Sequence, residues 1–114
     1  MEDTIFDKIL RQEIPCETVY EDDHVLAFKD VNPQAPVHVL VIPKKKVMSF
    51  DNLYNMESQQ IGEYMQKVSL VAHKLGLSKD GYRVVFNHGQ YGQQTVNYIH
   101  AHILSGRQLN WPPG

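Results

Sequence analysis

Tyr98-Ile99-His100-Ala101-His102-Ile103-Leu104 is the stretch of this 114-residue chain that says most about its fold and its chemistry. Side chains alternate between the two faces of an extended strand, so we expect Tyr98, His100 and His102 on one face. The small and aliphatic residues between them then pack on the other face. Two imidazoles that titrate near neutrality on one rigid strand can act on the same substrate. We therefore expect a functional site here.

The surrounding sequence predicts a sheet. Short apolar segments bounded by turn residues predict further strands at residues 18–20, 24–28, 37–42 and 82–86. The segment 37–42 is almost wholly apolar, which is typical of a central strand covered on both faces.

Two helices are expected, one short and one long. A capping pattern at Thr4 and Asp7 begins a short amphipathic helix that ends before Pro15. Asn55 is the expected N-cap of the long helix, which Gly76 closes. Helical spacing defines the apolar face of this helix: Ile61, Met65, Val68, Ala72 and Leu75. The expected fold is α+β, with an antiparallel sheet of about five strands covered on one face.

Composition limits the possible functions. Residues 1–114 suffice for one domain with its own core, and 42% of them are apolar. A net charge of −2 gives no basic surface for a nucleic acid polymer. The single cysteine, Cys16, excludes an internal disulfide. We expect no membrane contact and a cytoplasmic or also nuclear location, because no apolar run approaches the ~20 residues of a spanning helix and the acidic start lacks a secretory signal.

The His-x-His pair has three physical interpretations. Both histidines can be packing residues whose ring nitrogens are satisfied by neighbours. They can ligate zinc, with His38 as a third ligand. Alternatively, one imidazole attacks a substrate while its neighbour stabilises charge. The spacing alone does not separate metal binding from nucleophilic catalysis.

The preceding loop, Gly92-Gln93-Gln94-Thr95, favours catalysis. Reaction at phosphorus needs donors around the phosphoryl oxygens. We expect an amide from Gln94, a hydroxyl from Thr95 and backbone N–H groups near Gly92, none of which a zinc site requires. The alternative for this loop is an ordinary hairpin connection.

Nearly the whole chain resembles the histidine-triad (HIT) proteins, and among them the Hint branch of nucleotide-binding phosphoramidases. The resemblance implies a HIT domain over residues 1–114, with 107–114 as a C-terminal tail. The matching segments, in shared order and spacing, are 3–6 (DTIF), 13–15 (EIP), 20–23 (YEDD), 32–36 (NPQAP), 41–45 (VIPKK), 81–83 (GYR), 106–108 (GRQ) and 110–114 (NWPPG).

The resemblance also implies a role for each histidine. The middle histidine of the family motif attacks the α-phosphorus of a nucleotide and forms a nucleotidyl-histidine intermediate, and this position is His100. The last one, His102, binds and neutralises the phosphate, and a further histidine near the nucleophile falls on His38. The implied reaction cleaves the P–N bond of a purine nucleoside phosphoramidate to an AMP-like or GMP-like product, without a metal or other cofactor.

A nucleotide site is implied as well. The ribose-binding acid falls on Asp30 and the asparagine near the leaving group on Asn87. The phosphate loop falls on Gln93, Gln94 and Thr95. The implied apolar base pocket consists of Ile5, Ile9, Ile14, Phe28 and Val31. Without the resemblance, Asp30 is interpreted as a solvated turn residue and the apolar residues as ordinary core.

Relatives of this branch are homodimers, so the resemblance implies a homodimer here. By analogy, Trp111 in the tail reaches toward the partner subunit's site and shapes leaving-group selectivity. The alternative is a tail docked on its own subunit.

Two of the positions that depart from the family pattern bear on catalysis. Tyr98 stands where the first histidine of the triad is expected. Gln93 replaces a glycine and costs on the order of 1 kcal/mol if its φ is positive. The alternative function is therefore a nucleotide-binding or interaction module whose catalysis is weakened.

We expect turnover to be reduced but measurable, because a phenol of pKa ~10 exchanges protons poorly near pH 7. Restoring an imidazole with Tyr98→His should raise the rate of phosphoramidate hydrolysis. A variant that hydrolyses no faster than the natural protein contradicts this expectation.

Overall fold

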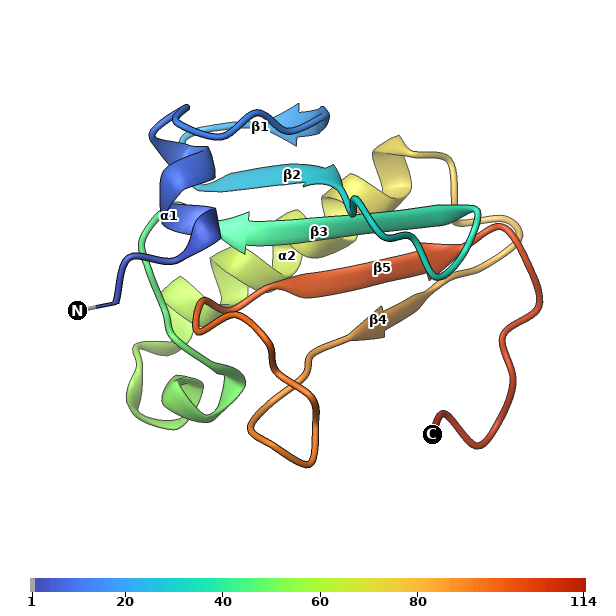
Figure 1. Ribbon diagram of the computed structural model, residues 1–114. Helices are drawn as coiled ribbons and strands as arrows, with labels where there is room; N and C mark the ends of the chain where they lie inside the picture. Colours follow the sequence, from blue (N-terminus) through green and yellow to red (C-terminus); the bar gives the residue numbers. More distant parts are fainter. Residues whose placement is uncertain (1) are drawn as a thin grey trace.

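The computed structural model describes residues 2–114 and contains a five-stranded antiparallel sheet in the order β1-β2-β3-β5-β4 (Figure 1). This order places β3 at the centre of the sheet, between β2 and β5. The strands are β1 (Thr18–Glu21), β2 (Val25–Lys29), β3 (Val37–Pro43), β4 (Arg83–Val85) and β5 (Ala101–Ser105), and the helices are α1 (Ile5–Leu10), the 3₁₀ helix η1 (Phe50–Asn55) and α2 (Ser58–Lys74).

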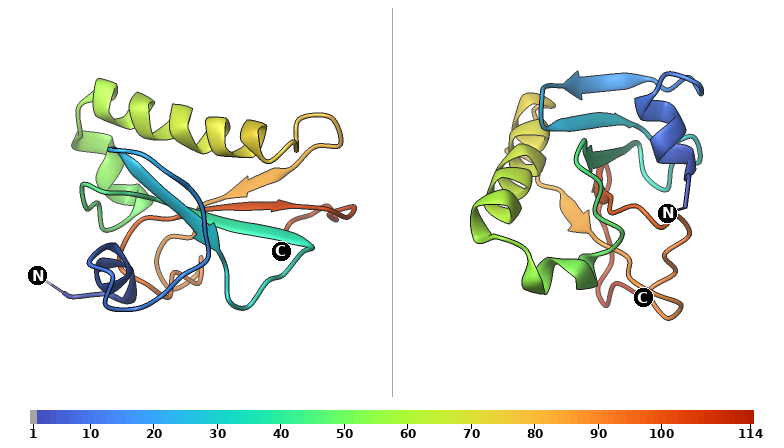
Figure 2. Two further views of the ribbon diagram at one scale, coloured as in Figure 1. Left: turned by 90° about the horizontal axis from the view of Figure 1, so that it is seen from above. Right: turned by 90° about the vertical axis from the view of Figure 1, so that its left-hand side faces the viewer.

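Helices lie on both faces of the sheet. The long helix α2 covers one face, and α1 lies against the other (Figure 2). A buried cluster therefore forms on each side, with Val68 and Val71 facing the sheet from α2 and Phe6 and Ile9 facing it from α1. The sequence predicted only the first covered face, since so short a helix as α1 gives a weak apolar pattern.

The predicted capping of α1 is confirmed. The Thr4 hydroxyl accepts from the Asp7 backbone N–H at 3.2 Å, and the Asp7 carboxylate accepts from the Thr4 N–H at 2.7 Å. This reciprocal pair satisfies two donors that a helix start leaves free.

The predicted start of α2 is wrong. Its N-cap is Glu57, and Asn55 instead ends η1. The buried face is also rotated, because Tyr64 and Val71 are buried while Ile61 and Met65 are only partly so. Tyr64 takes the central place because its hydroxyl can donate to the carbonyl of Val41 in β3, at 2.7 Å.

The predicted end of α2 is confirmed. Gly76 has a positive φ of 76°, and the Leu77 N–H donates to the Ala72 carbonyl at 3.2 Å. A glycine adopts this left-handed conformation without the steric cost of a Cβ. None of the helices within residues 2–114 is long and apolar enough to cross a membrane.

The histidine-bearing strand is shorter than predicted, since β5 begins at Ala101. The expected alternation still holds: Tyr98 packs in the cluster beside α1, and Ile99 and Ile103 pack in the cluster beside α2. The ladder stops because β3 ends at Pro43, and the Ile99 N–H donates instead to the Val47 carbonyl at 2.7 Å.

Candidate functional site

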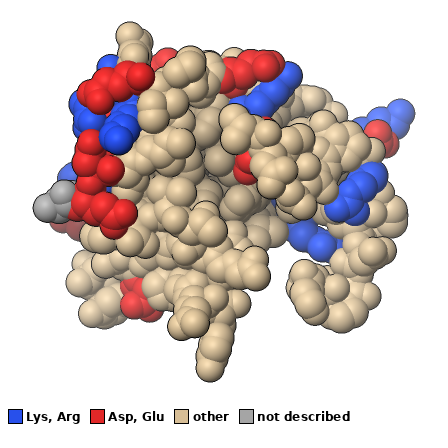
Figure 3. Space-filling view, in the orientation of Figure 1, with Lys and Arg blue, Asp and Glu red and all other residues tan. Residues whose placement is uncertain are grey.

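The pairing of β3 with β5 brings the predicted histidines together. In this antiparallel register His102 lies opposite Leu40, and His38 lies opposite Leu104. Both imidazoles lie on the face that carries α1. Figure 3 shows this face, on which Lys, Arg, Asp and Glu side chains gather mainly near the edge.

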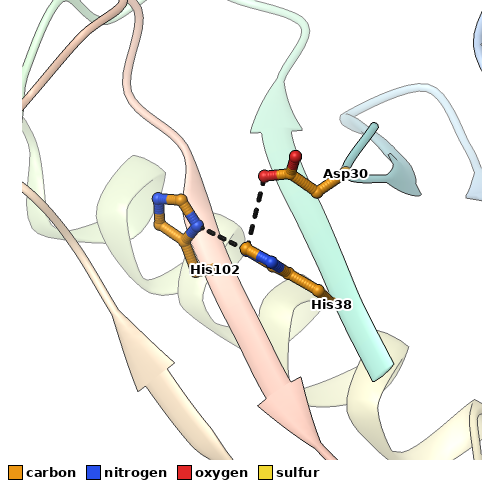
Figure 4. A group of neighbouring side chains, drawn as sticks. All are labelled: Asp30, His38 and His102. Atoms are coloured by element: carbon orange, nitrogen blue, oxygen red, sulfur yellow. Dashed lines mark hydrogen bonds and ion pairs between the residues drawn. The ribbon is translucent and has the colours of Figure 1, made fainter. Parts of the chain in front are cut away.

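Asp30, His38 and His102 form a continuous polar chain (Figure 4). His38 Nε2 lies 2.9 Å from His102 Nδ1 and 3.4 Å from the Asp30 carboxylate. The other ring nitrogen of His38, Nδ1, accepts from the backbone N–H of Gln34 at 3.0 Å. Neutral His38 therefore carries its proton on Nε2, which donates toward His102.

His102 is left with a free donor. Because its Nδ1 accepts from His38, the proton of neutral His102 resides on Nε2. This Nε2 is buried and has no hydrogen-bond partner within residues 2–114. Burial, reinforced by the neighbouring His100 and His38, lowers the pKa of His102 to about 4. A buried donor without a partner is costly unless a ligand satisfies it.

His100 has the opposite arrangement. Its Nδ1–H donates to the backbone carbonyl of Tyr98 at 2.7 Å, which leaves the lone pair on Nε2. Burial lowers the pKa of His100, so the ring is neutral near pH 7. The rings of His100 and His102 have centroids 5.0 Å apart. The pair therefore offers a nucleophilic nitrogen and a hydrogen-bond donor side by side.

The side chain of Tyr98, predicted as catalytic, points elsewhere. It is fully buried, and its hydroxyl donates to the carbonyl of Pro43. Burial raises the pKa of this phenol. Only the backbone carbonyl of Tyr98 reaches His100, so the phenol takes no part in proton exchange. The rate gain expected from the sequence for Tyr98→His therefore loses its physical reason.

The loop before the histidines is tightly folded on itself. A Cβ added to Gly92 would lie 2.3 Å from the carbonyl oxygen of His88, so only glycine fits there. Asn87 donates its side-chain amide to the Gly92 carbonyl at 2.7 Å. The N–H groups of Gln93 and Gln94 donate to Gln90 and Gly89 within the loop.

This folding corrects the expected set of anion donors. The side-chain amide of Gln94 donates to the carbonyls of Met48 and Val96, at 2.9 and 3.1 Å, and the backbone N–H groups of Gln93 and Gln94 are also used. These groups therefore hold the conformation of the loop and its contact with Met48. Thr95 is exposed beside them.

The predicted ribose acid, Asp30, lies directly after β2 and beside the histidines. Its Oδ1 accepts from the Asn32 N–H at 2.8 Å, and its Oδ2 faces His38. The carboxylate thus has a turn-forming role and also ends the polar chain.

The five apolar residues predicted for a base pocket divide into two groups. Phe28 and Ile9 are buried in the cluster beside α1, and Ile14 packs against it. Ile5 is 47% exposed and Val31 is 98% exposed. The large aliphatic side chains of Ile5 and Val31 therefore face solvent.

The donor set of Asp30, His38 and His102 has the composition of a metal site, with donor atoms within 4.8 Å of one another. A metal on His38 Nε2 needs the lone pair there and the proton on Nδ1. That proton would face the Gln34 N–H, which already donates to Nδ1 at 3.0 Å. The residues therefore do not fit a metal at this place.

Two contributors to the site were missed by sequence reasoning. The ring of Phe6 stands edge-on to His100, with centroids 4.9 Å apart. The backbone of Gln34 sets the tautomer of His38. In the sequence, Phe6 is one apolar residue of the short N-terminal helix. The partner of a backbone N–H cannot be inferred from residue types.

Comparison with known proteins gives concordant matches. Residues 11–109 match the family model described as HIT domain. A relative from Zea mays, the 14 kDa zinc-binding protein, is 53% identical over 97% of this chain and 88% of its own length. An uncharacterized HIT-like protein from Synechocystis is 52% identical over 99% of this chain and 98% of its own.

Solved structures agree with this assignment. The crystal structure of a HIT family hydrolase from Legionella pneumophila superposes with a TM-score of 0.89 at 44% identity, covering 96% of this chain and 98% of the other. A histidine triad protein from Clostridium difficile gives 0.87 at 43% identity, covering 96% and 97%.

The φ of Gln93 is 57°, which is the strained conformation considered from the sequence. Gln93→Gly should raise the free energy of unfolding by up to about 1 kcal/mol, because relief of the left-handed strain exceeds the added chain entropy. Urea unfolding measures this change.

Gln12 is a matched control, since it is also a glutamine with positive φ, 62°, but follows α1. Gln12→Gly should give a similar gain without altering ligand binding or turnover. A loss of stability in Gln93→Gly contradicts the assignment of strain to this loop.

Proposed function

The chain belongs to the HIT domain family, and we propose that it is a nucleotide-binding hydrolase that cleaves the P–N bond of purine nucleoside phosphoramidates. The observation that carries the proposal is the pair of opposed tautomers. His100 presents a lone pair on Nε2, and His102 beside it presents an unpaired Nε2–H. A phosphoryl centre needs both groups, a nucleophile for phosphorus and a donor for its oxygens.

The reaction proceeds in two steps. His100 Nε2 attacks the phosphorus, an N–P bond forms, and the P–N bond to the substrate nitrogen breaks as that nitrogen takes a proton from solvent and leaves as an amine. Water then attacks the phosphorus of the nucleotidyl-histidine, which releases the nucleoside 5′-monophosphate and regenerates His100. Covalent catalysis divides one difficult displacement into two easier ones.

The polar chain supports both steps. His102 Nε2–H donates to a phosphoryl oxygen, where negative charge grows in the transition state. His38 and Asp30 hold His102 in the required tautomer, through the 2.9 and 3.4 Å contacts. The Legionella relative described as a hydrolase supports this class of reaction. The maize relative is named for zinc, but the tautomer of His38 does not suit a metal here.

The nucleoside would bind beside α1. Asp30 accepts from the ribose hydroxyls, and a purine base lies against Phe28 and Ile9. The exposed Ile5 and Val31 would then cover the base, which removes their apolar surface from water. Thr95 contributes a hydroxyl at the phosphate, while Gln93, Gln94 and Asn87 shape the loop near the leaving group.

A second candidate is a nucleotide-binding or interaction module with weakened catalysis. Two observations favour it: the phenol of Tyr98 is bound to Pro43 rather than to a histidine, and Gln93 is strained. This candidate retains nucleotide binding and lacks turnover, so measured hydrolysis distinguishes the two.

His100→Ala should abolish hydrolysis of a fluorogenic adenosine phosphoramidate, by on the order of 10³-fold or more, because the nucleophile is lost. Mass spectrometry should also detect a nucleotidyl adduct on His100 in the natural protein and none in the variant. The matched control is His73→Ala, an exposed histidine on α2 that should leave the rate unchanged.

Hydrolysis persisting in His100→Ala contradicts the mechanism. Activity abolished by a chelator in the natural protein would instead indicate a metal hydrolase.

The pH dependence follows from the lowered pKa of His100. The reactive form is neutral, and burial keeps it neutral to a lower pH than an ordinary histidine, whose pKa is ~6.5. We expect kcat/KM to stay constant from pH 8 to about 6.5 and to fall only at more acidic pH. An acid limb centred above ~6.5 contradicts a buried neutral nucleophile.

We also propose a homodimer in which the tail of one subunit lies near the site of the other. The edge strand β4 has a free side, its Val84 is 40% exposed, and Trp111 is 80% exposed. Within the subunit the tail is held through Arg83, which donates to the Asn110 carbonyl at 2.9 Å and lies 5.9 Å from the Trp111 ring. So large an exposed aromatic at a chain end favours a partner surface.

Removal of residues 111–114 should change the relative rates for small and bulky amine leaving groups. Competition assays with two phosphoramidates measure this ratio, and light scattering measures the molecular mass. A monomer with unchanged selectivity on truncation indicates a tail that serves only its own subunit.

A further inference from the structure

The backbone that orients His100 lies outside the sheet ladder. β5 begins at Ala101, whereas the carbonyl that accepts from His100 Nδ1 belongs to Tyr98. Its position must therefore be fixed by other contacts. A shift of this carbonyl would release the Nδ1 proton and allow it to move to Nε2, where the lone pair is needed.

Two hydrogen bonds join this segment to the last residue of β3 and to the chain just after it. The Tyr98 hydroxyl donates to the Pro43 carbonyl, and the Ile99 N–H donates to the Val47 carbonyl at 2.7 Å. The two acceptors lie at either end of residues 43–47. Tyr98 and Ile99 are thus held from opposite sides of the sheet, since their side chains pack in different clusters.

Residues 43–47 are themselves anchored to the N-terminal helix. Lys46 Nζ forms an ion pair with Asp7 at 2.8 Å, with both side chains mostly buried. The same ammonium group lies 5.6 Å from the centroid of the Tyr98 ring. Asp7 also caps α1, the helix that presses Phe6 against His100. The acceptor for the Tyr98 hydroxyl is therefore part of a rigid frame.

We propose that the hydroxyl of Tyr98 is a positioning group for His100. By holding the Pro43 carbonyl it keeps the Tyr98 backbone carbonyl within reach of His100 Nδ1–H, which maintains the lone pair on Nε2. Its effect on turnover rests on the proposed function, but its effect on the tautomer does not. The side chain in the first triad position thus acts through the backbone and makes no contact with the substrate.

Tyr64 provides an internal control for this role. Its hydroxyl also donates to a carbonyl of β3, that of Val41, at 2.7 Å, and its side chain is also buried. It lies on the opposite face of the sheet, in the cluster beside α2. Tyr64→Phe and Tyr98→Phe therefore remove the same kind of hydrogen bond, but only the second removes it from the residue whose backbone carbonyl accepts from His100 Nδ1–H.

The experiment compares the two variants by ¹⁵N NMR of the histidine rings and by steady-state kinetics. Both should lower the melting temperature, since each removes a buried hydrogen bond. Only Tyr98→Phe should show a fraction of His100 with the proton on Nε2. Only this variant should also lose kcat, on the order of tenfold, with KM close to that of Tyr64→Phe.

Two results would overturn the proposal: an unchanged His100 tautomer in Tyr98→Phe, with or without a loss of kcat, or an equal tautomer shift in both variants. If Tyr98→Phe does not fold, NMR of the natural protein tests the proposal. A slowly exchanging Tyr98 hydroxyl proton together with an Nδ1 proton on His100 supports the role, and the absence of either overturns it. A natural protein that shows this tautomer but no hydrolysis contradicts only the proposed function.

Discussion

The hydrogen bond between His38 and His102 is the contact on which the rest of the site depends. It joins the neighbouring strands β3 and β5 over a distance of 2.9 Å. Because His102 Nδ1 accepts this bond, the proton of neutral His102 lies on Nε2. The backbone N–H of Gln34 sets the direction of this bond. It donates to His38 Nδ1, so the proton of neutral His38 lies on Nε2, the nitrogen that faces His102. The tautomers of two imidazoles, His38 and His102, thus follow from one main-chain donor.

Much of this protein could be predicted from its sequence, because the relevant patterns are local. Alternation placed Tyr98, His100 and His102 on one face, and Thr4 with Asp7 began a helix. The start of α2 was misplaced, since Asn55 caps as readily as any residue in its region and only packing selects among such candidates.

The rest of the site could not be predicted, because it depends on contacts between distant segments. Gln94 has the amide that a phosphate loop needs, but Met48 and Val96 bind it in the folded chain. The destination of the Tyr98 hydroxyl is decided by where β3 ends. A residue type specifies which bonds a side chain can make, and the fold determines which partner is nearest.

The sheet order has a consequence for how the protein is made. β1, β2 and β3 precede α2 in the chain, and β4 and β5 follow it, yet β3 and β5 are neighbours. During synthesis the first three strands can pair with their neighbours in the sequence. The pairing of β3 with β5 requires that the last strand has been translated. A chain that stops before His100 lacks both His100 and His102, so the histidines of the site can meet only after the last strand is made.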